Sequence, residues 1–150
     1  MCIRDSAWFA PPPPSGPTLV WSHGNGGNIG GRAEVLLALV DAGVGVLAYD
    51  YRGYGKSGGR PSEAGVYRDV LAAYDALRVT GIPAERLVAF GESLGDEDEV
   101  VPYELGTALY AAAPEPKRFL RATGAHHNDV FGAPGLIDAI ATFAREVTGD

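Results

Sequence analysis

The sequence predicts an α/β protein, a three-layer sandwich in which a mostly parallel sheet is covered by helices on both faces. Short apolar runs rich in β-forming residues alternate along the chain with longer segments whose apolar residues recur at helical spacing. The apolar runs lack the polar alternation of half-exposed strands, which is typical of parallel strands buried on both faces. Strands that alternate with helices in this way form a parallel sheet with helices on each side.

The size and composition of the chain fit one globular domain. With 150 residues and 15.7 kDa it can build a single core but not two. The net charge of −7 and the scattered basic residues argue against a nucleic-acid partner. No apolar run approaches the ~20 residues that span a bilayer. The single Cys excludes an internal disulfide and fits a reducing compartment, so we expect a cytoplasmic location.

The first six residues are set apart from the fold. Residues 1–6 resemble a translated sequencing adapter and are excluded from the fold, so that the predicted domain covers residues 7–150. We therefore expect the authentic N-terminus to be missing. Membrane association of the parent protein stays open for the same reason.

The domain begins with two predicted strands. Ala7–Ala10 is typical of the tail of a strand, and the Pro-rich residues 11–17 form a stiff loop. Thr18–Ser22 is an apolar run with β-formers, and the Gly-rich loop His23–Gly31 ends it.

A helix, a strand and a loop follow. The helix is predicted over Arg32–Asp41, and Gly43 is placed to close it in a left-handed turn. The nearly continuous apolar run Val44–Tyr49 predicts a buried parallel strand. The loop Asp50–Pro61 contains four Gly and a Pro, which excludes regular structure.

The middle of the chain repeats this alternation. Ser62 is a natural N-cap for a helix over Glu63–Arg78, and Leu87–Gly91 is the next strand. The predicted apolar face of the helix consists of Val66, Val70, Ala73 and Leu77.

The last third of the chain predicts two helices and a strand. A helix over Pro102–Ala113 begins with Pro in its first turn. A strand is expected at Arg118–Thr123 and a final helix at Gly135–Val147. The predicted strand order is 2-1-3-4, where the numbers denote the strands that begin at Thr18, Val44, Leu87 and Arg118.

Three segments carry possible chemistry. Gly91–Gly95 matches G-x-S-x-G directly after a strand, a pattern that suits a strained turn exposing the hydroxyl of Ser93. The loop His23–Asn28 supplies small residues that let backbone N–H groups approach a developing oxyanion. His23 itself is either a structural residue of this turn or a catalytic one. Residues 96–99 are acidic and 124–129 contain two His, so serine, acid and histidine follow the order of an α/β-hydrolase triad.

These segments, together with residues 49–57 and 98–102, resemble the successive landmarks of the α/β-hydrolase superfamily. The chain is most similar to bacterial α/β-hydrolase-domain proteins and serine-aminopeptidase-like members. The resemblance extends over nearly all of residues 8–147. It implies a shortened α/β-hydrolase core, a small-molecule acyl substrate and no cofactor.

The resemblance also implies the site residues. Ser93 would be the nucleophile, His127 the general base, and Asp98 the acid that orients the imidazole. The backbone N–H groups of Asn25 and Leu94 would form the oxyanion hole. The implied activity is cleavage of carboxylic ester or related acyl bonds through an acyl-enzyme.

One departure from the family lies between serine and acid. Gly95 runs directly into acidic residues, where the family has a helix and two further strand–helix units. At ~30 residues or more per βαβ unit, we expect some tens of residues to be missing at a join near 95–96. The loss leaves open whether this chain is active. The alternatives are a non-catalytic relic of the fold and a Rossmann-like dinucleotide-binding domain, although Ile29 stands where the third Gly of G-x-G-x-x-G is needed.

Overall fold

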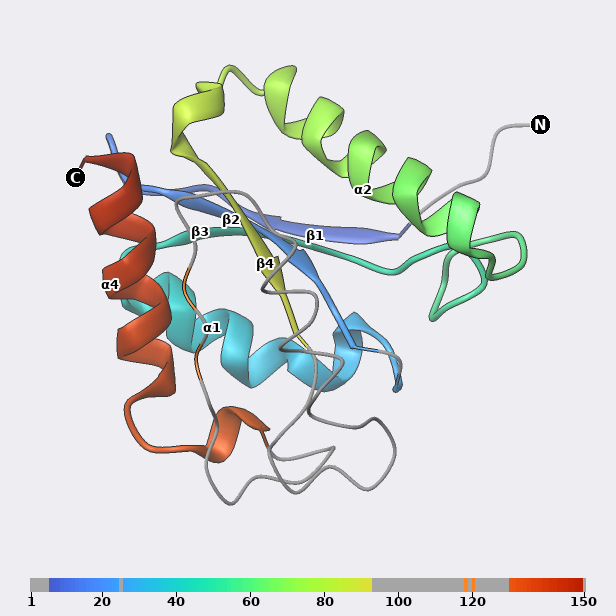
Figure 1. The fold of residues 1–150 in the computed structure, drawn as a ribbon, viewed down its shortest axis with the longest axis horizontal. Helices are drawn as coiled ribbons and strands as arrows, with labels where there is room; N and C mark the ends of the chain where they lie inside the picture. The colour runs from blue at the N-terminus through green and yellow to red at the C-terminus, as the bar shows by residue number, and fades with distance from the viewer. Residues whose placement is uncertain (1–5, 25, 93–117, 119, 121–129, 150) are drawn as a thin grey trace.

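The computed structural model describes residues 6–24, 26–92, 118, 120 and 130–149. Their sheet lies between two helical layers, with α2 on one face and α1 and α4 on the other (Figure 1). The predicted three-layer α/β fold is therefore confirmed. The strands are β1 (Ala7–Ala10), β2 (Thr18–Ser22), β3 (Gly45–Tyr49) and β4 (Leu87–Gly91). The helices are α1 (Ala33–Asp41), α2 (Glu63–Arg78) and α4 (Leu136–Thr148), with 3-10 turns η1 (Ile29–Arg32), η2 (Ala84–Arg86) and η3 (Val130–Gly132).

The order of the strands in the sheet is β1-β3-β2-β4. β2 runs parallel to both β3 and β4, as predicted for the strands that begin at Thr18, Val44 and Leu87. The order differs from the predicted 2-1-3-4 because β1, which that order leaves out, joins the edge beside β3 and runs antiparallel to it. The Pro-rich loop carries the chain past β3 before β2 begins, so consecutive strands are not neighbours. The predicted strand Arg118–Thr123 lies mostly outside the described residues.

The two faces of β2 are covered by different helices. Leu19 and Trp21 pack in a core with Leu39 of α1 and Ile140 of α4. Val20, on the opposite face, packs with Leu77 of α2. Alternate residues of a strand point to opposite faces, so a strand that is apolar at every position needs a helix on each side. Each fully buried side chain of this size contributes roughly 1.5–3 kcal/mol.

The helix boundaries follow the capping chemistry. α2 spans the predicted residues, and the Ser62 hydroxyl accepts a hydrogen bond from Gly65 N at 3.2 Å. Gly43 has φ +81° and closes α1 with its N–H on the Val40 carbonyl, as expected. α4 begins at Leu136 rather than at the predicted Gly135, because Gly135 has a left-handed φ of 74° that a helix interior excludes.

β1, β2 and β4 have the predicted limits. Three further boundaries differ by one residue, among them the end of α4, which is Thr148 instead of Val147. α1 begins at Ala33 because Arg32 belongs to the preceding 3-10 turn, and β3 begins at Gly45 instead of Val44. Residues 50–61 contain no helix or strand, as predicted. The predicted helix Pro102–Ala113 lies outside the described residues. None of the described helices is long and apolar enough to cross a membrane.

Candidate active site

Three loops meet at the carboxyl ends of the parallel strands. Ser22, the last residue of β2, pairs in register with Tyr49 of β3 and Gly91 of β4. The residues that directly follow β2, β3 and β4 are His23, Asp50 and Glu92. In open α/β sheets this edge is where ligands bind. The G-x-S-x-G segment and the Gly-rich loop consequently leave neighbouring strands at one edge, as the sequence predicts.

The five predicted site residues lie outside the described part of the chain: Ser93, Asp98, His127, Asn25 and Leu94. Their roles stay predictions. The described residues that flank them in the sequence are Gly24 and Gly26 around Asn25, and Glu92 before Ser93. The geometry of the site is therefore built from these neighbours.

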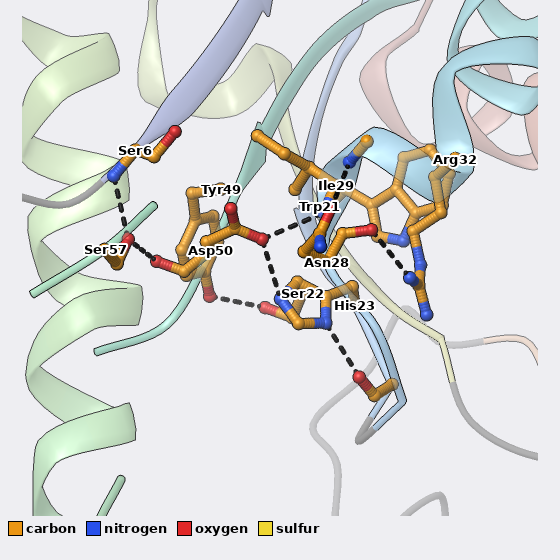
Figure 2. Close-up of polar contacts among 12 residues, drawn as sticks. Ser6, Trp21, Ser22, His23, Asn28, Ile29, Arg32, Tyr49, Asp50 and Ser57 are labelled. Atoms are coloured by element: carbon orange, nitrogen blue, oxygen red, sulfur yellow. Dashed lines mark hydrogen bonds and ion pairs between the residues drawn. The ribbon is translucent and has the colours of Figure 1, made fainter. Parts of the chain in front are cut away.

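His23 is buried at the start of the loop, with 4% of its surface exposed. Its Nδ1 donates to the Gly24 carbonyl at 2.7 Å, which fixes the proton on Nδ1 because a carbonyl can only accept (Figure 2). Nε2 lies 3.5 Å from Asp50 Oδ1 and makes no hydrogen bond with any described residue. The rings of Tyr51 and Tyr54 pack against the imidazole at 4.9 and 5.6 Å. Of the two roles open to His23, these contacts favour the structural one.

Asp50, the residue after β3, links the loop after β3 to the loop after β2. Its buried carboxylate accepts a hydrogen bond from Ile29 N at 2.8 Å, at the start of η1 (Figure 2). Its carbonyl accepts from the Ser57 hydroxyl at 2.6 Å, and Ser57 Oγ in turn accepts from Ser6 N at 2.8 Å. Sequence reasoning assigned no role to Asp50. The available signal was an acidic residue immediately after a fully apolar strand, where a buried charge requires hydrogen-bond donors.

Arg32 and Glu92 form a second link, which sequence reasoning also missed. Arg32 Nε and Nη2 donate to the two carboxylate oxygens of Glu92, each at 2.6 Å. The side chains are 14% and 12% exposed, so solvent screens this pair only partly. Trp21 Nε1 donates to the same carboxylate at 3.2 Å. No local pattern could have revealed the pair, because the two residues are 60 positions apart.

A third ion pair anchors the loop after β3 to α2. Arg52 Nε lies 3.0 Å from each oxygen of Asp69, and Arg52 N donates to Asp69 Oδ2 at 2.9 Å. Burial by itself raises the pKa of Asp69. The hydrogen bonds and the charge of Arg52 outweigh burial and bring the pKa of Asp69 below its ordinary value.

Tyrosines line the base of the site. The Tyr49 hydroxyl and Ser22 Oγ are hydrogen-bonded at 2.7 Å across the β2–β3 register pair. Burial raises the pKa of Tyr49 well above its ordinary value, although the hydrogen bond with Ser22 lowers it in part. Burial also raises the pKa of Tyr51. Both phenols are thus neutral near pH 7 and act as hydrogen-bonding groups rather than as bases.

Neither a groove elsewhere on the molecule nor a metal-binding cluster adds chemical groups to the described part of this site. A groove of about 370 Å³ lies at the opposite, amino end of β2 and β4, between the Pro-rich loop and residues Thr80, Ile82 and Arg86. Among the residues that the structure describes, no three His, Cys, Asp or Glu side chains are grouped so as to hold a metal ion.

Comparison with known sequences gives a family match. The sequence model of the family described as "Serine aminopeptidase, S33" matches residues 13–95. An uncharacterized protein of Mycobacterium tuberculosis is 29% identical over an alignment that covers 96% of this chain and 76% of that protein. The alpha/beta hydrolase domain-containing protein aho-3 of Caenorhabditis elegans is 40% identical over 57% of this chain, which is 26% of its own length.

Comparison with solved structures gives the fold. Est1E from Butyrivibrio proteoclasticus, solved with ferulic acid bound, superposes with a TM-score of 0.71 at 15% identity, covering 96% of this chain and 94% of that one. An alpha-beta serine hydrolase homologue from Coxiella burnetii gives a TM-score of 0.66 at 18% identity, with coverage of 93% and 91%.

Proposed function

Because this chain belongs to the serine aminopeptidase S33 family of the α/β-hydrolase superfamily, we propose that it is a serine hydrolase that cleaves carboxylic ester or related acyl bonds. The proposal assigns Ser93 as nucleophile, His127 as general base and Asp98 as the residue that orients the imidazole. The N–H groups of Asn25 and Leu94 are assigned to the oxyanion hole.

The proposed reaction has two steps. Ser93 Oγ attacks the acyl carbon while its proton passes to His127, and the bond to the leaving group breaks as that proton is delivered to it. A water molecule then attacks the acyl carbon and gives its proton to His127, which returns that proton to Ser93 Oγ as the bond between Oγ and the acyl carbon breaks. The products are a carboxylic acid and free Ser93. Backbone N–H donors stabilise the oxyanion of each tetrahedral intermediate.

One observation supports this assignment more than any other. Glu92 N donates to the Ser22 carbonyl at 2.9 Å, which continues the β2–β4 pairing one residue past the end of β4. The residue before Ser93 is thus held beside the residue before His23, the start of the Gly-rich loop. A nucleophile and its oxyanion donors need this kind of adjacency.

We also infer that the chain lacks an internal stretch after Gly95. The family match ends at Gly95, the residue at which the sequence predicts a join. The alignment with the M. tuberculosis protein spans 213 residues, whereas 96% of the 150 residues is about 144, so about 213 − 144 = 69 positions have no counterpart here. Sequencing of the source DNA across codons 95 and 96 tests this. Additional codons between them are expected, and continuous DNA would make the short form the natural one.

Labelling with a fluorophosphonate probe tests the activity. The probe phosphorylates activated serines, so we expect covalent labelling of this chain and none of the Ser93→Ala variant. Ser62→Ala is the matched control, because it removes the same hydroxyl from a helix cap that has no part in the proposed triad or oxyanion hole. Equal labelling of wild type and Ser93→Ala, or no labelling of wild type, would leave the non-catalytic relic as the better description. Protection from unfolding by NAD would instead favour dinucleotide binding.

A further inference from the structure

The guanidinium of Arg32 does more than neutralise Glu92. While Nε and Nη2 hold the carboxylate, Nη2 also donates to the Gly26 carbonyl at 3.1 Å. Nη1 donates to the Asn28 carbonyl at 2.9 Å (Figure 2). One planar group therefore satisfies two backbone carbonyls of the Gly-rich loop and both oxygens of a carboxylate. Only arginine offers this fork of donors.

The two ends of this bridge belong to different elements. Gly26 and Asn28 lie in the loop after β2, whereas Glu92 is the first residue after β4. The indole Nε1 of Trp21, which is buried in the core, also donates to the Glu92 carboxylate. The carboxylate is therefore held by a rigid side chain as well as by Arg32. Glu92 N is fixed on the Ser22 carbonyl at the same time. The bridge thus fixes the loop relative to the end of β4.

The loop and the strand end are also in close approach at Gly24. A Cβ on Gly24 would lie 3.3 Å from the Glu92 carbonyl oxygen and 3.5 Å from its Oε1. Glycine at this position lets the loop reach the backbone of residue 92. The ion pair therefore joins two segments that lie side by side, at a point where a residue larger than glycine would push against Glu92.

We propose that Arg32 and Glu92 are positioning residues. They set the distance between the Gly-rich loop His23–Gly31, which carries the proposed oxyanion donor, and the end of β4, which carries the proposed nucleophile. The inference rests on the proposed function, in which Asn25, between Gly24 and Gly26, donates an N–H to the oxyanion, and Ser93 follows Glu92. An oxyanion donor acts at 2.7–3.1 Å from the developing charge, so a displacement of about 1 Å removes most of its effect. In this proposal Arg32 and Glu92 act through the backbone segments that carry Asn25 and Ser93, and not on the reacting atoms themselves.

The variants Arg32→Lys and Glu92→Gln test this. Lysine keeps the charge but loses the fork, and glutamine keeps the shape but loses the charge. For the fluorophosphonate reaction we expect kinact to fall about tenfold or more in each, with KI changed less than about twofold, because positioning acts on the reacting step. The kinact of the double variant is expected to be no lower than that of the slower single variant, because both changes break the same ion pair.

Arg86→Lys is the matched control. Arg86 also holds loop carbonyls, those of Pro13 and Gly16, with Nε at 2.9 Å from Gly16 O, but at the opposite end of the sheet. It is expected to keep the wild-type kinact. A wild-type kinact for Arg32→Lys, or an equal fall for Arg86→Lys, overturns the proposal.

Hydrogen exchange separates this inference from the proposed function. In Arg32→Lys, amide exchange in the peptide covering residues 23–31 is expected to rise about tenfold or more over wild type, while β3 keeps its protection. If the fluorophosphonate probe does not label wild type, the proposed function is wrong. The exchange experiment by itself then tests whether Arg32 and Glu92 hold the loop. Unchanged exchange in residues 23–31 would show that the pair does not hold the loop.

Discussion

Gly55 packs so closely against the carboxylate of Asp50 that a Cβ on Gly55 would overlap Oδ2. Gly55 also has φ +49°, in the left-handed region that favours glycine. The same carboxylate receives Ile29 N and faces His23, so the space left by one glycine allows the buried acid to join three loop segments.

Gly55→Ala is expected to destabilise the protein more than left-handed strain alone does. Gly81→Ala is the matched control, because Gly81 has φ +83° and no atom within 4 Å of a Cβ. We expect Gly81→Ala to lower the free energy of unfolding by about 1–2 kcal/mol. Gly55→Ala should cost about 2 kcal/mol more, since Asp50 must give up its hydrogen bond to Ile29. Urea unfolding measures both, and equal losses would contradict the role assigned to Asp50.

Ser62→Ala is expected to lower the free energy of unfolding by about 1 kcal/mol, because Gly65 N loses its acceptor at the start of α2. Ser62→Asp keeps a side-chain oxygen at the cap and should restore most of the stability. Thermal unfolding followed by circular dichroism distinguishes them. The cap would be unimportant if the Ala and Asp variants melted alike.

Asp69→Asn should remove a pH-dependent part of the stability. A carboxyl whose pKa is lower in the folded state stabilises it above the unfolded value, here 3.8, and this contribution is lost as the pH falls through the folded pKa. At pH 7 we expect a loss of about 3 kcal/mol, because the mostly buried charge of Arg52 loses the Asp69 carboxylate. The difference between variant and wild type should narrow below pH 4.

The matched control for Asp69 is Asp75→Asn. Asp75 pairs with Arg78 at 3.7 Å, but the side chains are 75% and 71% exposed. The expected change is less than about 0.5 kcal/mol at pH 7. A difference for Asp69→Asn that stays constant down to pH 2 would contradict the lowered pKa.

Tyr49→Phe tests the effect of burial at alkaline pH. A phenol whose pKa is raised by folding stays protonated in the folded state while the unfolded chain ionises near its ordinary value of 10.0. Stability is therefore present below pH 10 and falls as the pH rises above it. Wild type should lose stability between pH 9 and about pH 11 more steeply than the variant.

Several elements could be predicted to within a residue because their signals are local. The limits of α2 follow from the Ser62 cap and from apolar residues three and four positions apart, which the structure buries as Ala73 and Leu77. β2 and β4 were likewise predicted from continuous apolar runs. The predicted site residues, Ser93 among them, lie outside the described residues and stay predictions.

The sequence by itself determined the alternation of strands and helices and the family, since both depend on neighbours along the chain. Only the tertiary structure decided that β1 joins the sheet beside β3, that Asp50 reaches Ile29, and that Arg32 reaches Glu92 across 60 positions. Such contacts depend on which strands lie side by side. No local sequence pattern encodes the strand order, because the residues that meet are far apart in the chain.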